Sequence, residues 1–306
     1  MEQALRDFFL FLSKNQTANT AAKKWGLRFG ASRFVAGVTI QDAIDAVREL
    51  NGKGILATLD HLGEFVFTEA EANESADYCM LTLKEIQKAG VKSNLSLKMT
   101  QLGLDISKDL CVANMRRILD TAKACNNFVR IDMEDYAHNE VTLDILKQLI
   151  AEGYDNVGTV LQAYLYKTEQ DIDDLNPHHL NLRLVKGAYK EPKEVAFPEK
   201  ADVDRNYIKI IEKHLKYGNY AAIASHDEAI IKHVKQFVKT HNIPKNQFEF
   251  QMLYGIRTQL QQQLANEGYT MRVYVPYGND WYGYFMRRLA ERPANVGFVM
   301  KSMVKK

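Results

Sequence analysis

Eight short apolar runs alternate with long amphipathic stretches from residue 54 onward. The runs are rich in β-branched and aromatic residues, which favour strands, and the stretches repeat apolar residues at spacings of three and four, which favours helices. The runs cover residues 54–60, 93–100, 128–134, 156–164, 180–189, 220–226, 248–255 and 271–278. Eight strand–helix units predict an α/β fold, a (βα)8 barrel of the TIM type. A doubly wound sheet alternates in the same way, so the count of eight favours the barrel.

The chain of 306 residues is predicted to form a single domain, because its hydrophobic content of 46% is ample for a core and single α/β barrels often have this length. We expect helices in residues 1–52 and the barrel in residues 53–306. Thr39 is the predicted N-cap of the last of these N-terminal helices, and Gly52 its terminal residue. The segment 280–293 is the expected eighth helix of the barrel.

Charge and composition exclude several classes of protein. A net charge of +2 argues against a polyanion-binding surface, so no nucleic acid partner is expected. No apolar stretch reaches the roughly 20 residues that span a bilayer, and the N-terminus does not resemble a signal peptide. Cys79, Cys111 and Cys125 are widely spaced, which predicts reduced thiols in a cytoplasmic protein rather than a disulfide or zinc framework. The sequence indicates no oligomeric state.

Common catalytic and nucleotide-binding motifs are missing from the sequence. It contains no GxGxxG, GxxxxGK[ST], GxSxG or HExxH. A Rossmann or P-loop nucleotide site, a hydrolase nucleophile elbow and a metalloprotease site are therefore unsupported, and no metal site is predicted.

Polar residues lie near the carboxyl ends of the apolar runs, where a barrel carries its active site. They are Asp60, His61, Lys98, Asp132, Glu134, Gln162, Arg183, Lys186, His226, Gln251, Tyr254, Tyr274 and Tyr277. A charge in a buried run costs several kcal/mol unless it is paired. Lys98 and Asp132 follow adjacent strands, so we expect them to pair. That pair could serve catalysis or only stabilise the barrel, and both interpretations stay open.

Two groups of cations raise a similar choice. Arg183, Lys186 and Gly187 end the fifth run, where two cations suit a pyrophosphate or an anionic ring and glycine lets backbone approach a ligand. A solvated strand end would explain them equally well. Arg287 and Arg288 lie side by side in the eighth helical segment, where they form either a solvated face or a clamp for an anion.

Eight motifs in one order carry a resemblance to a known family. They are LSLKMT, RIDME, VLQAYL, LRLVKGAY, SHD, FEFQMLYG, RVYVPYG and YFMRRLAERPANV. Together they resemble the catalytic barrel of the proline dehydrogenases, flavoenzymes that oxidise L-proline, and the combination of RLVKGAY, YVPYG and RRLAER is highly specific. The length resembles the monofunctional bacterial type, without an attached aldehyde dehydrogenase or DNA-binding domain.

The resemblance implies a distorted barrel whose eighth helix lies over the carboxyl ends of the strands. Arg287 and Arg288 would then bind the substrate carboxylate as guanidinium forks, and Glu291 would hold them in position. Lys98 and Asp132 would belong to the ion network around the substrate. The implied walls of the substrate pocket are Ala188, Tyr189, Leu253 and Tyr274.

The resemblance also implies a site for FAD. The implied FAD contacts are Gln162, Arg183, Val185, Lys186, Gly187, Ala188, Ser225 and His226, with Trp281 stacking on part of the cofactor. Arg183 would lie near flavin N5 and stabilise negative charge there. The implied catalytic residues are Lys98, Arg183, Arg287 and Arg288.

The implied reaction is oxidation of L-proline to Δ1-pyrroline-5-carboxylate, the first step of proline catabolism to glutamate, with electrons passed to a quinone. We expect a cytoplasmic enzyme, and quinone use would bring it into peripheral contact with the cytoplasmic face of the inner membrane. Two rivals stay open. One is a barrel lyase or aldolase with a phosphate-bearing ligand and a Schiff-base lysine, Lys98 or Lys186. The other is a non-catalytic barrel that serves as a binding scaffold.

Overall fold

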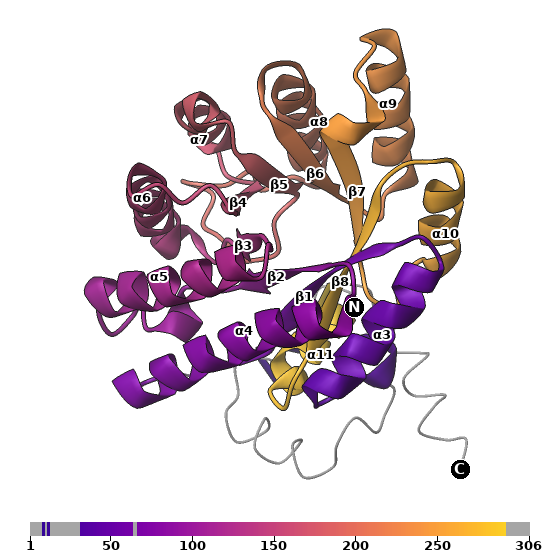
Figure 1. The fold of residues 1–306 in the computed structure, drawn as a ribbon. Coiled ribbons are helices and arrows are strands. Elements are labelled where there is room, and N and C mark those ends of the chain that lie inside the picture. The colour runs from indigo at the N-terminus through magenta and orange to yellow at the C-terminus, as the bar shows by residue number, and fades with distance from the viewer. Residues whose placement is uncertain (1–7, 10, 13–30, 64–65, 292–306) are drawn as a thin grey trace.

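Eight parallel strands form a closed barrel in the computed structural model, which describes residues 8–9, 11–12, 31–63 and 66–291 (Figure 1). Each strand pairs with the next along the chain, and β8 returns to pair with β1. The strands are β1 (Leu56–His61), β2 (Ser93–Leu97), β3 (Val129–Ile131), β4 (Val157–Gln162), β5 (Asn181–Val185), β6 (Tyr220–Ala224), β7 (Phe248–Leu253) and β8 (Met271–Tyr277). The predicted (βα)8 barrel is confirmed, and β1 alone extends beyond its predicted run, by His61.

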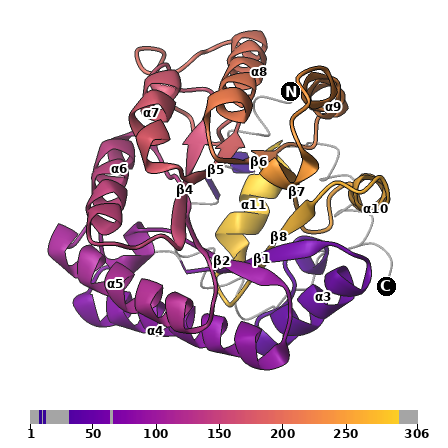
Figure 2. The same cartoon turned by 45° about the horizontal axis from the view of Figure 1, so that its top comes forward.

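A ring of helices surrounds the strands, and one helix departs from it. The helices are α3 (Ile40–Gly52), α4 (Glu69–Ala89), α5 (Lys108–Ala124), α6 (Tyr136–Ala151), α7 (Thr168–Leu175), α8 (Lys200–Tyr217), α9 (Glu228–Thr240), α10 (Thr258–Asn266) and α11 (Trp281–Glu291). Figure 2 shows α11 within the circle of the other helices, over the strands. The expected place of the eighth helix is therefore confirmed.

The N-terminal end of α3 follows the predicted capping chemistry. The hydroxyl of Thr39 accepts a hydrogen bond from the Asp42 N–H at 3.2 Å, and the Asp42 carboxylate accepts one from the Thr39 N–H at 2.9 Å. These reciprocal bonds form a capping box, which satisfies two N–H groups that a helix start leaves without partners. Gly52 is the last helical residue, as expected. Most of the remaining N-terminal region predicted as helical lies outside the described residues.

The two sides of the strands bury different chemistry. Leu59, Leu95 and Leu184 are completely or almost completely buried in the main apolar core. Polar side chains instead cross the barrel interior: Arg183 on β5 donates to Ser96 on β2, although these strands are not neighbours in the sheet. Because successive strand residues point to opposite sides, every second residue faces this polar interior.

Two further predictions can be compared with the described residues. Cys79, Cys111 and Cys125 are free thiols, and burial raises the pKa of Cys79 and of Cys111 to about 12. Within the described ranges, no helix is long and apolar enough to cross a membrane.

Candidate active site

A cavity of about 700 Å³ lies at the carboxyl ends of the strands, where α11 contributes part of its wall. It brings together nearly all of the predicted site residues. Those that line it are Lys98, Asp132, Gln162, Arg183, Val185, Lys186, Gly187, Ala188, Tyr189, Ser225, His226, Leu253, Tyr274, Arg287 and Arg288. Residues on or just after seven of the eight strands, together with residues of α11, therefore converge on one space.

Among the predicted residues whose side chains the structure describes, Trp281 does not line the cavity. Its stacking on the cofactor remains a prediction; in the structure Trp281 is only 4% exposed and packs in an apolar cluster with Phe34 and Phe285, outside the set of residues that line the cavity. The reason is its position at the first residue of α11, one turn before the residues that reach the cavity. The side chain of Glu291 lies outside the described residues, so its predicted role remains a prediction.

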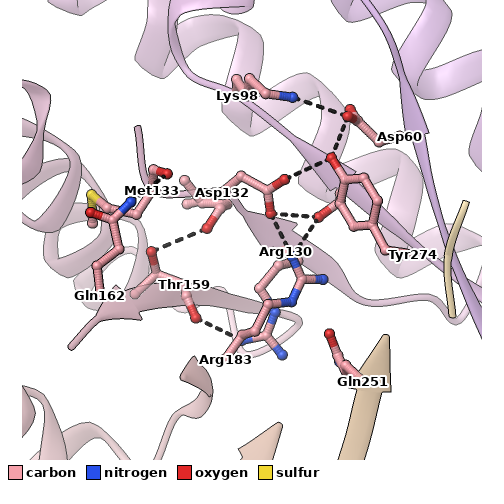
Figure 3. Close-up of polar contacts among 12 residues, drawn as sticks. Asp60, Lys98, Arg130, Asp132, Met133, Thr159, Gln162, Arg183, Gln251 and Tyr274 are labelled. Carbon is pink, nitrogen blue, oxygen red and sulfur yellow. Dashed lines mark hydrogen bonds and ion pairs between the residues drawn. The ribbon is translucent and has the colours of Figure 1, made fainter. Parts of the chain in front are cut away.

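Lys98 pairs with a carboxylate other than the predicted one. Its Nζ donates to Asp60 Oδ2 at 3.0 Å, whereas Asp132 Oδ1 accepts from Arg183 Nη1 at 2.7 Å (Figure 3). The expected direct Lys98–Asp132 pair is therefore wrong. Strand β2 lies between β1 and β3, and Lys98 at its end pairs with Asp60 of β1 rather than with Asp132, which follows β3. The Tyr274 hydroxyl joins the two ion pairs, since it contacts Asp60 Oδ2 and lies 3.1 Å from Asp132 Oδ2.

This network holds its members in defined protonation states. Burial alone lowers the pKa of Lys98, but Asp60 and Asp132 outweigh burial and raise that pKa above its ordinary value. Burial, aided by Asp132 and Asp60, raises the pKa of Tyr274 well above its usual range. Lys98 is therefore an ammonium ion and Tyr274 a neutral hydrogen-bond donor at physiological pH.

Two buried polar atoms on the cavity wall have no hydrogen-bond partner in the described part of the chain. Gln162 Nε2 donates to the backbone carbonyls of Met133 and Glu134, at 3.2 and 3.0 Å, which fixes the amide and leaves Oε1 unpartnered. Arg183 bonds through Nη1 to Asp132, and its Nε is unpartnered. Since buried polar atoms are normally bonded, an acceptor and a donor are available here to a ligand.

Another part of the cavity wall is built around Lys186 and Gly187. Lys186 Nζ lies 2.5 Å from Asp204 and 3.0 Å from Asp227. Burial lowers the pKa of Lys186, but hydrogen bonds to both aspartates outweigh it and raise that pKa. Gly187 has φ 113°, and a Cβ there would lie 2.2 Å from the Tyr164 ring. Packing of that ring requires a glycine here, and the close approach of a ligand to Gly187 remains a prediction.

The α11 side chains add positive charge opposite the strand ends. Arg288 is 9% exposed, and its guanidinium carbon lies 5.0 Å from the centroid of the Tyr284 ring. Burial raises the pKa of Tyr189 to about 12, an effect that the nearby charge of Arg287 partly opposes. Among the described residues that line the cavity, the cations Lys98, Arg183, Lys186, Lys200, Arg257, Arg287 and Arg288 outnumber the carboxylates Asp132 and Asp227. Such a balance suits a small anionic ligand.

Sequence reasoning left three contributors without a role. Asp60 is recognised as a strand-end carboxylate, but its burial and its contact with Lys98 depend on the neighbouring strand. Tyr284 lines the cavity, and its spacing of three and four from the two arginines places it on their helix face. Arg257 also lines the cavity and donates to the His226 carbonyl at 3.0 Å, without any sequence signal. In the described residues, no group of three or more His, Cys, Asp or Glu side chains could hold a metal.

Known proteins share this chain's sequence and fold. Residues 43–301 match the family described as proline dehydrogenase. Proline dehydrogenase 2 of Bacillus subtilis is 54% identical over 301 residues, covering 98% of this chain and 99% of the relative. Proline dehydrogenase of Deinococcus radiodurans is 49% identical over 290 residues, 92% of each chain.

A solved structure gives the same relationship in three dimensions. Proline utilization A (PutA) from Bdellovibrio bacteriovorus superposes with a TM-score of 0.80 at 28% identity, over 85% of this chain and 32% of that larger protein. The cavity therefore lies in a barrel shared with these proteins. The chain belongs to the proline dehydrogenase family, oxidoreductases of proline catabolism.

Proposed function

We propose that this chain oxidises L-proline to Δ1-pyrroline-5-carboxylate, with FAD as cofactor and a quinone as electron acceptor. The observation that carries the proposal is the convergence of Arg287 and Arg288, from α11, with Lys98 and Arg183, from the strand ends, on one cavity. Family membership supports the substrate, and the cation excess supports binding of its carboxylate.

The residues present fit a flavin. Its ring carries an N–H donor and several acceptors, which complement the unpartnered Gln162 Oε1 and Arg183 Nε. When bound, FAD would supply the acceptor for a hydride from the substrate, chemistry that no protein side chain provides. Arg183 would stabilise negative charge on the reduced ring. We propose as the remaining FAD-binding residues Val185, Lys186, Gly187, Ala188, Ser225 and His226.

Arg287 and Arg288 would bind the proline carboxylate through their guanidinium groups, which match a carboxylate bidentately. Fixing the carboxylate orients the ring and so contributes the positioning part of catalysis. We propose that Glu291 steadies the two arginines. The proposed pocket walls for the pyrrolidine ring, which also exclude water, are Ala188, Tyr189, Leu253 and Tyr274.

The same cations favour the reactive form of the substrate amine. Positive charge nearby lowers an amine pKa, because it disfavours the ammonium form. A neutral amine can donate electron density as a hydride leaves the adjacent carbon, whereas an ammonium ion cannot. Lys98 and the two arginines would supply this charge, and no dedicated general base is needed.

The pKa directions count against a Schiff-base lyase. A lysine that attacks a carbonyl must be neutral, which requires a lowered pKa. The pKa values of Lys98 and Lys186 are both raised by aspartate partners that outweigh burial. Neither lysine is therefore prepared for nucleophilic attack.

The proposed acceptor places the reaction at a membrane. Quinones dissolve in the bilayer, so a cytoplasmic enzyme that reduces one would contact the cytoplasmic face of the inner membrane peripherally. The first test incubates purified, FAD-loaded protein with L-proline and a soluble quinone. We expect quinone reduction with formation of a product that o-aminobenzaldehyde traps as a coloured adduct. Absence of the adduct would refute the activity, and its formation without quinone reduction would refute the acceptor.

A further inference from the structure

Residues 186–199, which connect β5 to α8, build one wall of the cavity without a helix or strand of their own. Lys186, Gly187, Ala188 and Tyr189 of this connection line the cavity. A loop wall keeps its place only where contacts outside the cavity hold it, because irregular backbone lacks the repeated hydrogen bonds of a helix or sheet. The contacts of this loop are therefore informative about how the substrate pocket is shaped.

Tyr164 contacts the loop at four points, one of which is its carbonyl, which accepts from the Phe197 N–H at 2.8 Å. Its backbone N–H donates to the Lys186 carbonyl at 2.9 Å, and its ring fills the space beside Gly187. Its hydroxyl reaches Glu191 Oε1 at 3.4 Å. Because Tyr164 is only 7% exposed, it is a fixed support rather than a mobile surface group.

Glu191 makes a second contact, with the first residue of α6. Its Oε1 accepts a hydrogen bond from the N–H of Tyr136, the first residue of α6, at 2.8 Å. Asp135 caps the same helix by accepting from the His138 N–H at 3.2 Å, so the two carboxylates serve different N–H groups. A carboxylate is favoured here, because the N-terminal N–H groups of a helix lack internal partners and carry partial positive charge.

These contacts connect the loop with the segment that carries Asp132. That residue lies four positions before the start of α6, and its carboxylate belongs to the Arg183 and Tyr274 network. Glu191 thus joins the loop that carries Ala188 and Tyr189 to the start of α6, four residues after Asp132, and it does not itself line the cavity.

We propose that Glu191 is a positioning residue, which holds Ala188 and Tyr189 in place against the substrate through its bonds to Tyr136 and Tyr164. The role of the two pocket residues rests on the proposed function, whereas the tethering of the loop does not. Loss of the tether leaves every cavity-lining side chain present and loosens the wall that two of them share.

The test uses Glu191→Ala with two companions. Glu191→Gln keeps an oxygen that can accept from Tyr136 and should stay close to the unmodified chain. Glu194→Ala removes the same charge from an exposed position of the same loop and serves as the matched control. In Glu191→Ala we expect the KM for proline to rise by about fivefold to tenfold, with a smaller change in kcat, since positioning is lost but no reacting group is removed.

Limited trypsin digestion measures how firmly the loop that carries Glu191 is held, and it needs no substrate. Lys190 and Lys193 flank Glu191 and are exposed, so a loosened loop should be cut faster after them in Glu191→Ala and not in Glu191→Gln or Glu194→Ala. Tyr164→Phe keeps the ring beside Gly187 and removes one bond to Glu191, so a smaller acceleration of trypsin cleavage is expected. This variant replaces Glu191→Ala in the test if Glu191→Ala does not fold. Unchanged cleavage or an unchanged proline KM overturns the proposal. A wild-type chain that leaves proline unoxidised refutes the proposed function instead, and cleavage still decides the tether.

Discussion

Two polar layers of buried and half-buried side chains lie inside the barrel, and they use the same kinds of side chain for different roles. The basal layer lies near the start of its strands and consists of Arg130, Asn181, Tyr220, Glu249 and Arg272. The mouth layer lies near the strand ends and consists of Asp60, Lys98, Asp132, Arg183 and Tyr274. Each combines arginine, carboxylate and tyrosine, so composition does not separate them.

The layers differ in how completely their polar atoms are bonded. In the basal layer, Glu249 accepts from Arg272 Nε at 2.8 Å and from the Tyr220 hydroxyl at 3.1 Å, and Arg130 donates to the Thr159 carbonyl at 2.8 Å. Judged against the described residues, no buried side-chain polar atom of this layer lacks a partner. In the mouth layer, Asp60 Oδ1 and Arg183 Nε lack one. Saturated polar networks stabilise a fold, and unsaturated ones remain able to bind a ligand.

The largest expected effect should come from breaking the basal layer. Glu249→Ala would leave the buried Arg272 guanidinium without its carboxylate, which costs about 3–5 kcal/mol of unfolding free energy for a buried pair. Urea denaturation measures this loss. The proline KM of the folded fraction should stay unchanged, and a raised KM with unaltered stability would show that the two layers are not separate in function.

Arg288→Met should have the next largest effect and the opposite character. A charge-assisted hydrogen bond contributes about 1.5–3 kcal/mol, so the proline KM should rise by about tenfold to a hundredfold. Methionine keeps apolar volume beside Tyr284, and FAD should stay bound. Steady-state kinetics and the flavin content of the purified variant provide the measurement. Ordinary proline affinity would eliminate Arg288 as a carboxylate ligand.

Lys98→Ala should lower kcat by about tenfold, because the mouth network loses its ammonium ion next to the substrate amine. Stability should change less than in Glu249→Ala, since Lys98 Nζ lies at the cavity, where water can replace it beside Asp60. Comparing the change in kcat with the change in the urea midpoint distinguishes a catalytic role of Lys98 from a role in stabilising the barrel. Preserved kcat with a strongly lowered midpoint would make Lys98 a structural cation like those of the basal layer.

The smallest effect is expected from the partly exposed cluster of His138, Asp105 and Asp135. His138 contacts Asp105 and Asp135, and their hydrogen bonds outweigh burial and raise the pKa of His138 to about 9. A raised folded-state pKa contributes stability that is fully present below pH 6.5 and is lost as the pH rises through about 9. Solvent screens this partly exposed cluster, so the contribution should be below about 1 kcal/mol. Urea midpoints at pH 7 and pH 10 should therefore differ less in His138→Gln than in the unmodified chain, and equal differences would remove His138 as the cause.

The fold and the membership of the site could be read from the sequence because both depend on local pattern and order along the chain. Alternating apolar runs placed the strands, and polar residues at their ends identified the cavity. α7 is harder to predict from sequence than the longer helices. It has only eight residues and no side-chain N-cap bond, and so short a helix shows little periodicity in its apolar residues.

Which side chains contact each other within the site could not be predicted from the sequence in the same way. Lys98 follows a strand with two neighbours, and only the barrel geometry shows that it pairs with Asp60 rather than Asp132. Trp281 lies on the same helix as Arg287 and Arg288. The cavity does not reach as far along α11 as Trp281, which packs in the apolar cluster instead. The glycine at position 187 is required by the Tyr164 ring, which is distant in sequence. Each of these depends on contacts between separate strand–helix units.

The central claim is that the unsaturated mouth layer binds L-proline beside a flavin. The absorption spectrum of the purified, FAD-loaded chain before and after anaerobic addition of L-proline tests it most directly. We expect flavin absorption bands that disappear when L-proline is added and persist when D-proline is added as a control. A chain that does not retain FAD, or whose flavin bands are unchanged by saturating L-proline, would contradict it.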